Sequence, residues 1–128
     1  MFGKGSLSPV FTTDDEKIET LTLDSLLIAN NLNKVDFIKI DVEGYEYSIF
    51  KGGEKVLRSA QAPDILFEFL DWAESSTNIF KPGDAQKLLW EYGYHLYKVD
   101  ELNNLIFIND NCPIIVGSEL IFASKKHK

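Results

Sequence analysis

The clearest hydrophobic pattern in the sequence predicts two β-strands in the first half of the chain. Val35 to Val42 (VDFIKIDV) is rich in β-branched and aromatic residues, and Asp64 to Leu70 (DILFEFL) shows the same enrichment. The first segment is apolar on both faces at its start and becomes polar toward its carboxyl end. Such a strand is typical of a sheet that is covered on both sides. We therefore expect the first segment to be buried in such a sheet.

Segments with helical spacing of apolar residues lie between these two strands and after the second one. Residues 45–60 (YEYSIFKGGEKVLRSA) place their apolar side chains on one stripe, and Gly52-Gly53 predicts a bend or a break in this helix. Pro82-Gly83-Asp84 predicts the start of another helix, which Gly93 should terminate. The intervening residues 71–81 are interpreted as a polar loop that holds Trp72.

Shorter patterns complete the predicted element order. Ile18 to Leu23 alternates apolar and polar residues as a short strand does, and Asp24 stands where the N-cap of a helix over residues 25–29 belongs. Residues 1–17 are interpreted as an irregular lead-in. Three further strands are predicted, the first two as a hairpin: Tyr94 to Val99, Leu105 to Asn109 and Glu119 to Ser124.

This order of elements predicts a single domain of the α/β class. Strands that alternate with helices form right-handed crossovers and a parallel sheet, whereas the last strands, without a helix between them, predict an antiparallel edge at the C-terminal end. A chain of 128 residues has room for one hydrophobic core of this kind.

Charge and composition exclude several classes of partner. The net charge is −7, and three of the thirteen basic residues, Lys125, Lys126 and Lys128, lie at the C-terminus. The remaining acidic body disfavours nucleic-acid binding, and no apolar run approaches the roughly 20 residues that span a membrane. Cys112 is the single cysteine, which excludes a disulfide framework and a multi-cysteine metal site. We expect no metal ion and a cytoplasmic location.

Acidic residues at the ends of the two central strands are the candidate chemical groups. Asp41 and Glu43 follow the first strand, and Glu68 lies near the end of the second. Parallel neighbours would bring these carboxylates to one rim, where ligands of open α/β sheets bind. There they could hold ribose hydroxyls, take a proton from a substrate hydroxyl, or bind Mg²⁺. The alternative is structural, because acids at such positions also cap helices and stabilise helix N-termini.

Lys39 has two interpretations. Its place within a central strand requires a partner or a water-filled cleft, and Asp41 on the same face is the natural partner. Alternatively, the strand is an exposed edge and Lys39 protects it from aggregation.

The stretches TLTLDSLL, VDFIKIDVEGYEYSIFKGGEKVL and APDILFEF resemble the C-terminal half of FkbM-type methyltransferases, from about Thr20 to Phe69. This resemblance implies a class I, Rossmann-like methyltransferase fold that uses S-adenosylmethionine to methylate hydroxyl groups of sugars, polysaccharides or polyketide-type acceptors. It makes the strand at residues 35–42 the fourth of that fold, followed by the fifth, the sixth and an antiparallel seventh. The catalytic candidates are then Asp41, Glu43 and Glu68, and the cofactor would lie near Lys39 and Gly44.

The resemblance also implies what these 128 residues lack. The family's first strand, its glycine-rich turn and the acid that holds the cofactor ribose precede the matched region. We therefore expect a partial domain, truncated at its N-terminus, that binds S-adenosylmethionine weakly or not at all by itself. The strand at residues 35–42 should become an edge that pairs with a second copy or a partner chain. The alternative function is a non-catalytic α/β interaction module, or one half of a split enzyme.

Overall fold

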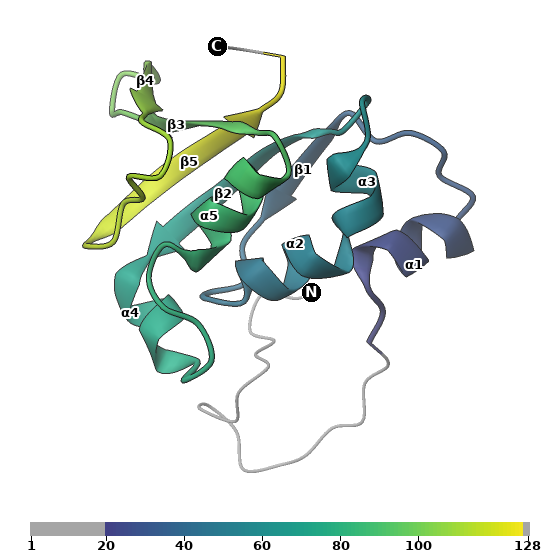
Figure 1. The fold of residues 1–128 in the computed structure, drawn as a ribbon, viewed down its shortest axis with the longest axis horizontal. Coiled ribbons are helices and arrows are strands. Elements are labelled where there is room, and N and C mark those ends of the chain that lie inside the picture. Colours follow the sequence, from purple (N-terminus) through teal and green to yellow (C-terminus); the bar gives the residue numbers. More distant parts are fainter. Residues whose placement is uncertain (1–19, 127–128) are drawn as a thin grey trace.

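Five strands form one mixed sheet in the computed structural model, which describes residues 20–126 (Figure 1). The strand order is β1-β2-β5-β3-β4. Their bounds are Phe37–Ile40 (β1), Asp64–Leu70 (β2), His95–Val99 (β3), Leu105–Ile108 (β4) and Ser118–Ser124 (β5). The strands that the hydrophobic pattern predicts between residues 35 and 124 are therefore confirmed, with β1 shorter than expected.

Within residues 20–126, five helices connect or precede these strands (Figure 1). The predicted break at Gly52-Gly53 is confirmed, because one helix ends at Gly52 and the next begins at Glu54. The helices are Leu23–Ala29 (α1), Glu46–Gly52 (α2), Glu54–Arg58 (α3), Asp71–Ser76 (α4) and Asp84–Glu91 (α5). None of the helices in this described part of the chain is long and apolar enough to cross a membrane.

The sheet contains one parallel pair of neighbours, β1 with β2. β5 lies between β2 and β3 and runs antiparallel to both, and β4 pairs antiparallel with β3. The prediction of a parallel sheet therefore holds for β1 and β2 alone among neighbouring strands. The antiparallel edge of the sheet is β4. The last strand, β5, lies inside the sheet, because it is inserted between β2 and β3.

The hydrophobic core lies on one face of the sheet. Along β2, Ile65, Phe67 and Phe69 are buried beneath α2 and α5, while Glu68 on the opposite face is exposed. Lys39 of β1 is likewise exposed. The prediction of a β1 strand covered on both sides is therefore wrong. The face of β1 that points away from the helices is exposed. Only the apolar side chains of β1 on the face toward the helices are buried or partly buried.

The structure corrects the predicted start of the ordered chain. Residues 20–22 form no strand, and residues 18–19 of the predicted strand, like the lead-in at 1–17, lie outside the described residues. Thr22, rather than Asp24, is the N-cap of α1, and its hydroxyl accepts the Ser25 N–H at 3.1 Å. The Asp24 carboxylate instead accepts two N–H groups in the first turn of α3.

Residues 71–81 are not wholly a loop, because their first half is α4. The segment DWAESS contains no glycine or proline that would prevent a helix. Six residues are too few to show a helical period in the sequence, which is why the pattern did not reveal it. α4 follows β2 directly and so lies at the carboxyl end of that strand, near the candidate residues.

Candidate functional site

The structure brings Asp41 and Glu68 to the same level at the carboxyl ends of β1 and β2. Ile40 pairs with Phe67 in the parallel register, so the next residue in each strand direction is one of these acids. Ile40 and Phe67 are both buried, and alternation therefore directs Asp41 and Glu68 toward the open face. Both acids are exposed. The predicted rim thus has two neighbouring carboxylates in contact with solvent.

A tight turn carries the chain from β1 into α2. Glu43 is exposed and has a φ of 48°, and Gly44 follows with a φ of 103°. A Cβ atom on Gly44 would lie 2.4 Å from the carbonyl oxygen of Ala73 in α4. Only glycine permits this approach, so the turn is held closely against α4 and Glu43 has a defined position at the rim.

Glu46 is a further carboxylate at this rim that sequence reasoning did not select. Its Oε2 accepts the N–H of Gly44 at 3.0 Å, and its side chain is buried, with a residue exposure of 4%. Burial raises the pKa of Glu46 to about 7, and the negative charges of Glu74 and Asp41 add to this effect. The Gly44–Glu46 spacing and the first turn of a helix were visible in the sequence, but the burial of Glu46 was not.

Glu74 lies on the other side of the turn and is also buried, with an exposure of 3%. Its Oε1 accepts the N–H of Gly83 at 2.8 Å. Burial is the main cause that raises the pKa of Glu74. Two buried carboxylates therefore hold neighbouring backbone segments in place: Glu46 binds the N–H of Gly44 before α2, and Glu74 binds the N–H of Gly83 before α5. Sequence reasoning missed Glu74 because it assigned residues 71–81 to a loop.

The surroundings of Lys39 and the grouping of possible metal ligands can be described within residues 20–126. Lys39 is exposed on β1, which is an edge strand of the described sheet, and no ion pair joins it to Asp41. β1 is therefore an exposed edge strand, as the second interpretation requires. No group of three or more His, Cys, Asp or Glu side chains in these residues is arranged to hold a metal ion.

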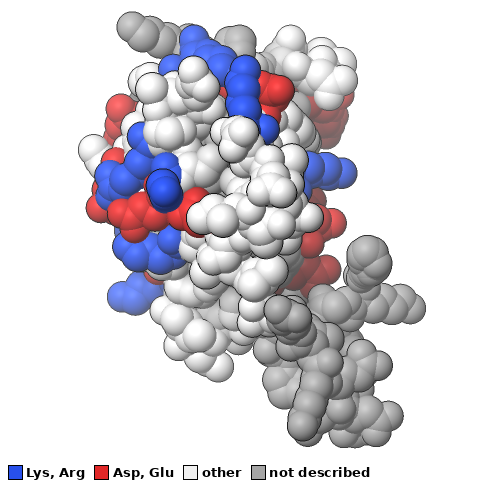
Figure 2. Space-filling model, turned by 90° about the vertical axis from the view of Figure 1, so that its right-hand side faces the viewer, with Lys and Arg blue, Asp and Glu red and all other residues white. Residues whose placement is uncertain are grey.

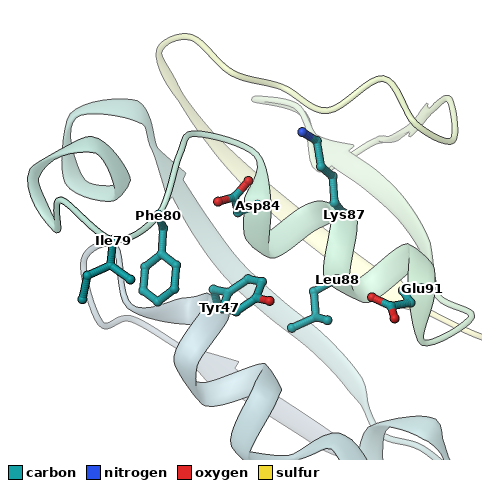
Figure 3. Close-up of a pocket in the computed structure, with 7 residues that line it drawn as sticks. All are labelled: Tyr47, Ile79, Phe80, Asp84, Lys87, Leu88 and Glu91. Atoms are coloured by element: carbon teal, nitrogen blue, oxygen red, sulfur yellow. The ribbon is translucent and has the colours of Figure 1, made fainter.

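A hollow of about 380 Å³ lies beside the rim, between α2 and α5 (Figure 3). Tyr47 and Phe80 form one wall, with ring centroids 4.9 Å apart. Charged residues of α5 form the other wall. Phe80 also contacts Tyr45 edge-on at 6.3 Å, so the hollow adjoins the turn that carries Glu43.

Comparison with known proteins assigns the chain to a family. The model of the methyltransferase FkbM domain matches residues 2–96 of the 128. The curated proteins and the solved structures gave no match. The match includes β1, the turn at Glu43-Gly44, α2 and β2, and it ends within β3. The chain therefore belongs to the FkbM methyltransferase family.

Proposed function

We propose that the chain forms the acceptor side of a domain that transfers a methyl group from S-adenosylmethionine to a hydroxyl group of a small-molecule or glycan acceptor. The observation that carries this proposal is the position of Asp41 and Glu68, side by side at the carboxyl ends of two parallel strands in a member of a methyltransferase family. Ligands of open α/β sheets bind beyond this end of the strands. Asp41, Glu43 and Glu68 are exposed there and can contact an acceptor.

The charged groups of the rim suit the charged and hydroxylated parts of the cofactor. Exposed carboxylates accept hydrogen bonds from ribose hydroxyls and attract a cationic sulfonium, and the Lys39 ammonium on the same face can pair with a carboxylate. The Gly44 N–H already donates to Glu46, so Gly44 contributes through the shape of the turn. When bound, S-adenosylmethionine supplies a methyl group whose C–S bonding electrons remain on sulfur as the methyl leaves.

Asp41 is proposed as the general base. Its carboxylate accepts the proton of the acceptor hydroxyl as that oxygen forms the new bond to the methyl carbon. Glu43 and Glu68 accept hydrogen bonds from neighbouring hydroxyls and so orient the acceptor. A positioned general base contributes a factor of roughly 10²–10⁴ to the rate, and positioning contributes further.

Label transfer tests this proposal. A full-length parent that contains this chain is incubated with S-adenosylmethionine carrying a labelled methyl group and with a panel of methyl glycosides and polyols. We expect label in the acceptor, and we expect Asp41→Asn to reduce kcat by at least about 100-fold. Asp36→Asn is the matched control, because Asp36 is an exposed acid just before the amino end of β1. Equal turnover by Asp41→Asn and the parent would remove Asp41 from this role, and absence of transfer to every acceptor would contradict the activity itself.

A second candidate function, association through the edge of the sheet, is favoured by the surface beside β1. Figure 2 shows a band of uncharged atoms running down this side of the molecule. α1 has no buried residue, and Leu26, Ile28 and Phe37 are 45%, 69% and 51% exposed. Edge strands with apolar neighbours tend to pair with another chain. A second copy is the proposed partner, because antiparallel self-pairing of one edge closes under a two-fold axis.

The oligomeric state tests this association. Light scattering during gel filtration should show a dimer that dissociates on dilution. Phe37→Glu should shift the equilibrium toward the monomer, since it places a charge on the pairing edge, whereas Phe107→Glu on the opposite edge strand β4 should not. A stable monomer at high concentration would contradict self-association.

A further inference from the structure

The connection from β4 to β5 presents exposed apolar side chains beside the start of α4. Trp72 of α4 is 59% exposed, and Ile115 and Val116 of the connection are 54% and 74% exposed. Two hydrogen bonds join these segments: the Asp71 N–H donates to the Gly117 carbonyl at 3.0 Å, and the Gly117 N–H donates to the Asp71 carboxylate at 2.8 Å. Trp72 and Val116 are each one residue from this pair, so their Cα atoms lie within about 13 Å of each other. These three side chains, the apolar patch, therefore lie at the same end of the sheet.

The backbone that carries the apolar patch is fixed on both sides of Ile115 and Val116. Gln86 of α5 is fully buried, and its amide pairs with the backbone of Ile114: Nε2 donates to the carbonyl at 2.8 Å, and Oε1 accepts the N–H at 2.9 Å. The two hydrogen bonds at Gly117 hold the other end. A surface that is already ordered loses little conformational entropy when a partner binds to it.

The composition of the apolar patch is typical of an interaction surface. Single exposed apolar side chains are common on soluble proteins and need no explanation. Here a tryptophan and two β-branched residues lie together on fixed backbone, and aromatic residues are enriched at protein interfaces. Covering these side chains would remove apolar surface from water, which is the main favourable contribution to association.

The charge around the apolar patch determines which partner fits. Residues 41–50, 67–80 and 113–120 meet at this end of the sheet and contain no lysine or arginine. Asp41 and Glu68 are exposed there, and no ion pair within the described part of the chain involves either carboxylate. This negative surface attracts cationic groups and repels anionic ones.

We propose that the apolar patch docks a protein partner through a segment in which apolar side chains are flanked by lysine or arginine. The apolar side chains of that segment pack on Trp72, Ile115 and Val116, and its cationic groups lie over the neighbouring carboxylates. A lipid surface fits less well, because anionic headgroups would face the acidic rim and zwitterionic ones offer it no net charge. The docking surface stands on α4 and the connection before β5, and it does not require methyl transfer at the rim.

Nuclear magnetic resonance of the isotope-labelled 128-residue chain tests this surface. The probe is a synthetic peptide of about 15 residues, made of leucine and lysine in the pattern of an amphipathic helix. It should shift the backbone amide signals of residues 71–73 and 114–118, with saturation below about 1 mM peptide. An analogue with glutamate in place of lysine should bind at least about tenfold more weakly. Raising the NaCl concentration from about 50 to 500 mM should weaken binding of the lysine peptide severalfold.

Two variants test the apolar part of the contact. Trp72→Ser should weaken binding of the lysine peptide about tenfold, and Val116→Ser should weaken it about threefold. Leu32→Ser is the matched control, because Leu32 is 52% exposed and follows α1, which lies on the other side of the molecule from α4 (Figure 1). Its affinity should equal that of the parent. The spectrum of each variant shows whether the chain is folded.

Several results would overturn the proposal. Absence of shifts at residues 71–73 and 114–118 does so, as does equal binding of the glutamate peptide or unchanged affinity in both Trp72→Ser and Val116→Ser. Phosphatidylcholine vesicles that perturb the same signals more strongly than the peptide would assign the surface to a membrane. Signals that change with the concentration of the chain alone would assign it to a second copy. Peptide binding at the apolar patch in a parent without transferase activity would support docking while contradicting the proposed reaction.

Discussion

Replacing Glu46 with Gln isolates the cost of burying a carboxylate behind the Glu43-Gly44 turn. The amide has nearly the same shape and retains an oxygen that can accept the Gly44 N–H, which lies 3.0 Å from Oε2 in the parent. It cannot ionise. The variant therefore keeps the packing and the hydrogen bond and removes only the charge, so any difference in stability that depends on pH reports on that charge.

The expected magnitude follows from the pKa of Glu46, which rises from 4.5 to about 7 on folding. This rise is equivalent to about 3 kcal/mol between the two states. Below pH 4.5 the group is protonated in both the folded and the unfolded chain, and its contribution to stability is fully present. As the pH rises through 7, the unfolded chain has released the proton and the folded chain resists doing so. The parent should therefore lose up to about 3 kcal/mol over this interval.

Urea denaturation between pH 4.5 and 8 measures the effect. Glu46→Gln should match the parent at the acid end and exceed its free energy of unfolding at pH 8 by up to about 3 kcal/mol. Glu74, whose pKa burial also raises, is present in both proteins, and the difference between them includes its repulsion of the Glu46 charge. Glu101→Gln, in the exposed turn between β3 and β4, is the control for the same chemical change. The reasoning is refuted if Glu46→Gln and the parent lose stability in parallel as the pH rises.

Two further predictions concern backbone contacts near the rim and can be measured by the same denaturation assay. Gly44→Ala should cost more than about 2 kcal/mol, because the new Cβ would meet the Ala73 carbonyl and the φ is positive; Gly117→Ala, with a φ of 86° and open space around it, should cost only about 1 kcal/mol. Equal costs would show that contact with α4 does not constrain the turn. Asp24→Ala should cost about 1–2 kcal/mol by removing the cap of α3, and Asp24→Asn less; no loss in Asp24→Ala would contradict the capping role.

The elements that the sequence predicts well are those with strong local signals. β2 has the bounds that its apolar pattern predicts, Asp64 to Leu70, and α5 begins directly after Gly83. In both cases neighbouring residues alone supply the signal, through β-branched enrichment or through glycine and proline. α4 escaped prediction because its six residues are fewer than two helical turns and its start at Asp71 carries no distinctive cap.

Some residues of the candidate site could likewise be selected from local sequence patterns, whereas others could not. Asp41, Glu43 and Glu68 could be selected as candidates because acids at strand ends form a local pattern, and the parallel register of β1 with β2 brings two of them side by side. Glu46 and Glu74 belong to the same residue type and lie nearby, yet they are buried and their pKa values are raised. Nothing local distinguishes an exposed glutamate from a buried one, since the distinction depends on what the turn and α4 pack against.

The sequence by itself determined the order of most elements, the acidic rim and the family, because each is encoded in contiguous residues. Only the tertiary structure decided that β5 lies between β2 and β3, that the face of β1 opposite the helices is open, and that two glutamates are buried behind the rim. These outcomes depend on hydrogen bonds and packing between segments far apart in the chain, such as the pairing of Phe67 with Ile121. Such contacts leave no periodic signal in either segment alone.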